Sequence, residues 1–361
     1  MSIDRDDKDD GARGSASQLI ALAAASPGRA ERTLDHAIAD FFIPDDARLD
    51  ERIRATLAAT LAAIVALVEQ DVRRRAAATL AAEGHPKRAD RVAEGMPVLD
   101  RLIASGQLRD RELMRELLAR TRQDLLADAL PAIPADEAGA GSLLARLSNS
   151  GDAHVARAAL ALMAAESRRR TFLDTYRATQ TELPAELHHR LVWWVAAAIR
   201  EQVTGLNADR AIADAAPRAL GAHDESDRVE ATAMQLASAI AAQPVELPTL
   251  LIHALGERRV TLFIALLAHA LGLDYTVARD AVVDGAAPLW LMLRAAELDR
   301  AAIARIGLSL HDADPRRDVH AFADLLDAIV AVTPDEARAA LAPLKLHPDF
   351  RASISALEGP Q

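Results

Sequence analysis

The chain has 361 residues, of which 51% are hydrophobic but only 3% are aromatic, and its formal net charge is −11. Alanine alone accounts for 81 residues, and a core of Ala, Leu, Ile and Val suits close-packed helices, whereas sheets favour β-branched and aromatic side chains. The composition therefore excludes an all-β protein, and the high apolar content excludes a disordered chain. Cysteine is absent, which excludes disulfides and every cysteine-based metal or redox site.

The charge distribution and the hydropathy indicate where in the cell the protein is found and which classes of partner it can bind. No segment is strongly basic, so binding to nucleic acid or anionic lipid lacks its usual electrostatic footprint. Residues 1–14 are acidic, unlike a secretory signal. The longest apolar stretches, such as residues 57–68, are interrupted by threonine and are too short to span a bilayer. We therefore expect a cytoplasmic protein with no membrane partner and a disordered acidic tail over residues 1–14.

The first third of the chain shows helical periodicity. Residues 15–25 and 29–42 are two helical stretches, and from Leu49 to Leu80 apolar residues recur at steps of three or four. This stripe predicts one helix of about 37 residues, which ends before the helix-breaking Gly84-His85-Pro86. A stripe of this length needs partners. We expect residues 110–130, which have a matching apolar face, and the short helices on either side to be among them. We predict a helical bundle over residues 15–130 and a linker over residues 131–142, which contain two prolines.

The second half of the chain repeats a pattern of three apolar residues on a helix. The pattern recurs after 37, 37 and then 31 residues, which is the period of two-helix solenoid units. We therefore predict an all-α protein in which the N-terminal bundle is followed by a HEAT-like α-solenoid over residues 143–357. Further helices are expected at 274–284, 288–298, 299–308, 318–332 and 334–346. The four copies are Val155/Ala159/Leu162, Val192/Ala196/Ile199, Val229/Ala233/Leu236 and Val260/Ile264/Leu267.

Two short motifs in this half carry a resemblance. Residues 144–152 read Leu-x-x-Leu-Ser-x-Ser-Gly-Asp, and residues 290–298 read Trp-Leu-Met-Leu-Arg-Ala-Ala-Glu-Leu. With these motifs the run from residue 143 to about 310 resembles an uncharacterised bacterial family of HEAT-like helical-repeat proteins. The resemblance implies a helical-repeat fold, and it implies no activity, because none is established for the family.

Motifs for catalysis or cofactor binding are missing from the sequence. It contains no phosphate-binding glycine loop, zinc-protease motif or nucleophile elbow. His188 and His189 are neighbours whose side chains point about 100° apart on a helix, whereas a metal needs i, i+3 or i, i+4 spacing; we expect both on the solvated surface. The acidic residues 223–227 are expected to cap a helix. We predict no catalytic residue, metal or cofactor, and keep His36 as the candidate of a weaker alternative, a helical phosphocarrier.

Two groups of residues are candidates for binding a partner. Trp193 and its neighbour Trp194 are two of only three tryptophans. In the repeat register Trp193 falls where the other copies have small or polar residues, so it is either a partner anchor or packs on a neighbouring element. Arg168, Arg169 and Arg170 end a predicted helix, where cations are favoured by the helix dipole; the sharper alternative is a surface for an anionic partner.

Residues 99–122 suggest a helix-turn-helix. A short helix is followed by a turn at Ser105-Gly106 and by a second helix whose arginines could contact nucleic acid, although Glu112 and Glu116 cancel much of the charge. These arginines are Arg111, Arg115, Arg120 and Arg122.

Solenoids usually bind other macromolecules, so the first hypothesis is a non-catalytic protein-interaction or scaffold module, with bacterial regulation or signalling as its setting. This inference is by analogy of fold. The first alternative is a DNA-associated transcriptional regulator that uses residues 99–122. A protein partner is expected, nucleic acid is not favoured, and the oligomeric state is open.

Overall fold

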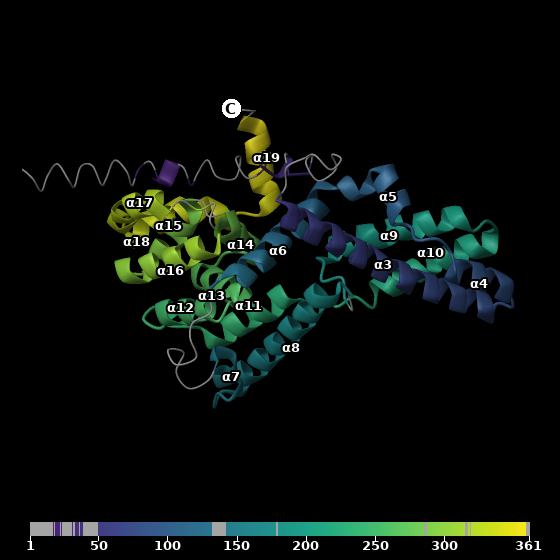
Figure 1. Ribbon diagram of the computed structural model, residues 1–361, viewed down its shortest axis with the longest axis horizontal. Helices are drawn as coiled ribbons and strands as arrows, with labels where there is room; N and C mark the ends of the chain where they lie inside the picture. Colours follow the sequence, from purple (N-terminus) through teal and green to yellow (C-terminus); the bar gives the residue numbers. More distant parts are fainter. Residues whose placement is uncertain are drawn as a thin grey trace, which may run out of the picture. The chain divides into compact units, whose positions relative to one another are not determined.

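The computed structural model describes residues 50–131, 142–177, 180–284, 287–314, 317 and 319–358, together with positions 17, 19–21, 23, 31, 33–35, 37 and 38. Every regular element in these residues is a helix, which confirms the all-α prediction (Figure 1). The predicted acidic tail over 1–14, most of the predicted linker and His36 lie outside the described residues.

The long apolar stripe forms one helix, as predicted. Helix α3 covers Glu51–Ala82, and the Asp50 carboxylate accepts a hydrogen bond from the Arg52 backbone N–H (2.9 Å), which caps its first turn. Gly84, in the left-handed conformation with φ 80°, lies just beyond the helix end. The buried apolar residues of α3 follow the predicted stripe: Ile53, Leu57, Leu61, Ile64, Val65, Val68, Val72, Ala76 and Leu80.

The partners of α3 are only partly the expected ones: one is a short helix directly after it, and two come from the predicted repeat half. It packs against α4 (Pro86–Ala93), α9 (Ala185–Gln202) and α10 (Leu206–Leu220), which lie along it in Figure 1. The prediction that residues 110–130 are a main partner is wrong. Helix α10 is better suited than residues 110–130 to pack against α3, because its buried face carries five alanines. Small side chains at a contact let two helix axes approach closely.

Helix α3 also corrects the expectation that no apolar segment is long enough to span a bilayer. By length and composition alone it is long and apolar enough, and it is the one such helix in the part of the chain that the structure describes. Half of its most apolar window is buried against the protein. A core helix of a globular protein passes the same test, so α3 is explained by its packing.

The described residues pack as two compact units, each discontinuous in sequence. Unit 1 comprises the described residues up to 36, those of 122–162 and those of 233–361, and unit 2 comprises those of 37–121 and 163–232. Helices α6 (Arg111–Ala129), α8 (Ala153–Thr175) and α11 (Val229–Ile240) contribute residues to both units. The bundle and repeat ranges inferred above stay predictions.

The remaining elements complete the two units. Unit 2 also contains α5 (Leu99–Ser105) and the 3-10 turns η1 (Gln107–Arg109) and η2 (Glu225–Asp227). In unit 1, α13 buries nine of its twelve residues, which is typical of a central core helix. The other helical elements of unit 1 are α7 (Leu143–Ser148), α12 (Leu247–Gly256), α13 (Val260–Leu271), α14 (Tyr275–Asp284), α15 (Ala287–Ala295), α16 (Arg300–Ala313), α17 (Val319–Ala331), α18 (Pro334–Leu341), η3 (Ala342–Lys345) and α19 (Pro348–Glu358).

The repeat pattern identifies core positions correctly. All twelve residues of the four copies are buried, and they lie on α8, α9, α11 and α13. The later predicted helices are also present, as α14 to α18. These findings confirm the helices and their apolar faces, whereas the HEAT-like stacking of the pairs stays a prediction.

Candidate functional site

Trp193 lies on the exposed side of α9, the second repeat helix. Its side chain is 38% exposed, whereas Val192 and Val195 on either side of the tryptophan pair are fully buried. The indole Nε1–H donates to Nε2 of His189 one turn earlier (3.2 Å), and the two rings meet edge to face with centroids 6.3 Å apart. The exposed indole is therefore held in one orientation. Trp194 is half-buried.

The three consecutive arginines on α8 do not form one anionic-partner surface. Arg168 donates to the backbone carbonyl of Asp227 (2.9 Å). Arg169 is buried, and its guanidinium carbon lies 5.4 Å from the centre of the Phe172 ring, within range of a cation–π contact. Arg170 is exposed. Unit 2 uses two of the three side chains internally, which leaves Arg170 as the one directed to solvent.

The segment over residues 99–122 has the predicted order of helix, turn and helix, but its second helix is buried. Helix α5 ends at Gly106, whose left-handed φ of 77° turns the chain into η1. The Asp110 carboxylate then accepts from the Leu113 backbone N–H (2.9 Å) and starts α6. Leu113, Met114, Leu117 and Leu118 of α6 are in the core, and Glu116, Arg120 and Thr121 are buried as well. Arg111 at its start is exposed, and Arg115 is half-buried.

The arginines of α6 are engaged within the protein. Arg120 is 1% exposed, and Arg122 pairs with Asp284 of unit 1 (3.3 Å). Arg111 and Arg115 also have interaction partners. A contact between Arg120 and a phosphate would require the guanidinium to leave its buried carboxylates, so the prediction of a nucleic-acid contact is wrong for this residue. Its burial is the physical reason.

Arg120 belongs to a buried ion cluster that joins α6 to the start of α11. Its Nη2 lies 2.9 Å from Glu116 Oε1 and its Nε 3.5 Å from Glu230. Arg228 contacts the same two carboxylates at 3.4 and 3.6 Å and donates to the Glu182 carbonyl (3.1 Å). Glu225 also pairs with Arg228 (3.0 Å), so two arginines face three glutamates and the cluster has no excess positive charge with which to hold an anion. Breaking such a pair is strongly destabilising, which fits a structural role.

A second polar group in unit 2 is a pair of stacked imidazoles. The rings of His188 and His223 lie 4.1 Å apart with planes 18° from parallel. Thr181 Oγ1 lies 3.1 Å from His188 Nδ1, and His223 Nε2 lies 2.9 Å from the Leu183 carbonyl oxygen. His188 is 7% exposed, so the expectation of two solvated histidines is wrong for it. Burial, with the nearby His223, lowers its pKa to about 4; at neutral pH the ring is uncharged.

The acidic segment that precedes α11 caps local structure, as expected. The Asp224 carboxylate accepts from the Ser226 backbone N–H and hydroxyl (2.9 and 2.7 Å), which lowers its pKa. Across the described part of the chain, no group of three or more His, Asp or Glu side chains is placed to hold a metal ion.

Comparison with known proteins gives one finding about identity. No curated protein and no solved structure matches the chain. Residues 136–342 match the model of a family described as uncharacterised protein conserved in bacteria (DUF2336). The match covers more than half of the chain and includes α9 and every later helix up to α18. The chain therefore belongs to this family of uncharacterised bacterial proteins.

Proposed function

We propose that the protein is a non-catalytic binding module that anchors a partner protein through Trp193 on α9. The supporting observation is the oriented, exposed indole in a chain with only eleven aromatic residues. Tryptophan is enriched among the residues that dominate interface energetics, because it offers a large rigid contact area. The hydrogen bond to His189 lowers the entropy that the indole would lose on binding.

The surroundings of Trp193 fit an anchor with a polar rim. Its neighbours on the exposed side of α9 include His189, Arg190 and Ala197, which give a mixed polar surface. Arg190 is already paired with Asp110 (3.2 Å) and Glu112 (2.5 Å), so this part of the rim is ordered. Rim contacts exclude water from a central anchor while contributing little energy themselves.

The test compares Trp193→Ala with Tyr176→Ala, a control that removes another exposed aromatic side chain of unit 2. Proteins retained from a bacterial lysate by the immobilised wild type are identified, purified and titrated. Trp193→Ala should weaken the strongest interaction at least about 30-fold, which corresponds to roughly 2 kcal/mol. Its melting temperature should match that of Tyr176→Ala.

Two outcomes would contradict the proposal. If Trp193→Ala lowers the melting temperature strongly, the indole is a packing residue rather than an anchor. If it keeps the wild-type melting temperature and retains every partner at wild-type affinity, α9 does not provide the anchor.

A further inference from the structure

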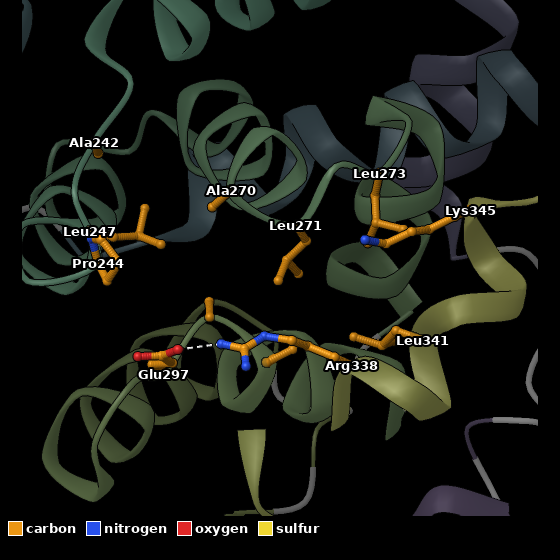
Figure 2. Close-up of a pocket in the computed structure, with 12 residues that line it drawn as sticks. Ala242, Pro244, Leu247, Ala270, Leu271, Leu273, Glu297, Arg338, Leu341 and Lys345 are labelled. Atoms are coloured by element: carbon orange, nitrogen blue, oxygen red, sulfur yellow. Dashed lines mark hydrogen bonds and ion pairs between the residues drawn. The ribbon is translucent and has the colours of Figure 1, made fainter. Parts of the chain in front are cut away.

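Unit 1 contains a pocket of about 200 Å³ between the ends of several helices. Figure 2 shows Leu271 pointing into the space between the α12–α13 side and the α15–α18 side. Most of the lining is aliphatic, and the charged groups on its rim are Glu297, Arg338 and Lys345. The aliphatic lining consists of Ala242, Pro244, Leu247, Ala270, Leu271, Leu273, Ala295, Ala296 and Leu341.

The two cations on the rim differ in their availability. Arg338 pairs with Glu297 (Figure 2) and with Asp335 (2.8 Å), which raises its pKa. Lys345 is exposed on η3, and within the described residues its ammonium forms neither an ion pair nor a hydrogen bond. It is one of only three lysines beside 39 arginines. Lys345 is thus the positive charge that an incoming anion can meet.

The ammonium is placed at the mouth of the pocket. In Figure 2 the Lys345 side chain runs toward Leu273, and its Nζ lies 3.8 Å from where a Cβ on Gly272 would be. Gly272 ends α13 in the left-handed conformation (φ 61°). A simpler role for the lysine is therefore to stabilise the carboxyl end of the α13 dipole, and the experiment must separate the two.

Two residues beside the pocket have a left-handed backbone, Ala241 with φ 43° and Glu297 with φ 63°. Beyond the end of α15, the Leu298 N–H donates to the Leu293 carbonyl oxygen (3.1 Å) and the Glu297 N–H to that of Arg294 (2.9 Å). This is a common way for a helix to end with a left-handed residue, so helix termination accounts for the φ of Glu297. Its carboxylate pairs with Arg338.

We propose that this pocket binds a straight-chain aliphatic carboxylate of about six to eight carbons, with the chain against the leucines and the carboxylate at Lys345. The size follows from the volume, since a cavity of about 150 Å³ accommodates benzene. The aliphatic residues of the lining suit a hydrocarbon chain. A single free ammonium matches one carboxylate, whereas a phosphate favours the paired donors of several arginines.

The experiment measures octanoate binding to the full chain by isothermal titration at pH 7.5. The wild type should bind one octanoate saturably. Lys345→Met, which keeps the aliphatic stem, and Ala270→Phe, which fills the pocket from an exposed position, should each weaken binding at least about tenfold. Octanol should bind at least about tenfold more weakly than octanoate. Lys87→Met, which removes an exposed lysine on α4, is the matched control and should bind as the wild type does.

Three results would overturn the proposal. Wild type that binds no octanoate saturably refutes it directly, and a lowered melting temperature of Lys345→Met would then assign the lysine to the end of α13. Equal binding by wild type and Lys345→Met refutes the anion site. Equal octanoate binding by wild type and folded Ala270→Phe refutes the pocket as the binding site. If Ala270→Phe does not fold, the titrations of Lys345→Met with octanoate and of wild type with octanol test the proposal instead. Trp193→Ala should bind octanoate normally, so this test is independent of the proposed protein partner.

Discussion

At the scale of single residues, three consecutive arginines on α3 have different surroundings. Arg73 is buried, and its guanidinium donates to Glu69 (2.8 Å), to the carbonyl oxygens of Val92 (2.7 Å) and Met96 (2.8 Å), and to the Gln202 side chain (3.0 Å). The next two arginines instead pair with a partly exposed aspartate on the same helix. One arginine thus links α3 to the segment after α4 and to the end of α9.

The first prediction concerns this link. Arg73→Met should lower the free energy of unfolding by about 3–5 kcal/mol, because the Glu69 carboxylate would remain buried without its counter-ion. Arg74→Met is the matched control: its side chain is 72% exposed, and it should change stability by less than about 0.5 kcal/mol. Urea unfolding followed by circular dichroism measures both. Equal effects of the two substitutions would show that the Arg73 contacts do not contribute.

The second prediction concerns pH. Because the folded protein holds the pKa of His188 at about 4, below its ordinary 6.5, the unfolded chain takes up the proton first as the pH falls. Stability from this residue is therefore complete above about pH 6.5 and is lost between pH 6.5 and 4, by at most about 3 kcal/mol.

The measurement is the unfolding free energy of wild type and His188→Asn from pH 7.5 to 4.5. Asparagine retains a polar atom near Nδ1 for Thr181 but does not titrate, so the variant should lose less stability over this range than the wild type. His189→Asn, at the exposed neighbouring position, should follow the wild-type curve. Parallel curves for wild type and His188→Asn would contradict the assignment.

These residues also show why the sequence predicts the position of a side chain on its helix better than the contacts that the side chain makes. The register placed Trp193 off the buried seam, and its side chain is exposed. The same reasoning treated His188 and Arg120 as surface groups. Their burial depends on partners far along the chain, such as Glu230 for Arg120, and helical periodicity contains no information about such contacts.

At the scale of elements, α16 and α17 meet through a glycine and a ring. A Cβ on Gly307 would lie 2.2 Å from the Phe322 ring, and that ring stacks on Trp290 with centroids 4.6 Å apart. A glycine inside a helix normally costs about 0.5–1 kcal/mol relative to alanine. Here it provides the space that the ring occupies.

The third prediction follows from this contact. Gly307→Ala should destabilise the protein by about 1–3 kcal/mol despite the better helix propensity of alanine, because the added methyl overpacks the ring. Gly151→Ala, where a Cβ would meet nothing within 4 Å, should be close to neutral. Thermal unfolding of the two variants side by side measures the difference, and a stabilised Gly307→Ala would show that Phe322 moves away without cost.

Helix existence and helix faces were the properties that the sequence predicted best. Apolar residues at steps of three and four identified α3 and the buried seams of α8, α9, α11 and α13, since the side that enters the core must be apolar wherever its partner lies. The partners themselves were not predictable in this way. An alanine-rich face such as that of α10 fits many apolar stripes, so its pairing with α3 is decided only in three dimensions.

At the scale of the whole molecule, the net charge and the contacts of the arginines both bear on binding to nucleic acid. The net charge is −11, and Arg120, Arg122, Arg168 and Arg169 all contact groups within the protein. Binding to nucleic acid requires cations that are free to replace counter-ions on the phosphates. These four arginines are thus not free to contact a phosphate backbone while the chain is folded.

The pairing of α3 with α9 and α10 has a consequence for the order of events during synthesis. Helix α3 ends at Ala82 and α10 at Leu220, so roughly 140 more residues must be translated before the apolar stripe can be fully covered. At about 5–20 residues per second this takes roughly 7–28 s. For most of that interval the nascent 32-residue α3 has only α4 among its main partners. We therefore expect the nascent chain to bind chaperones at the ribosome, and truncations before residue 220 to aggregate.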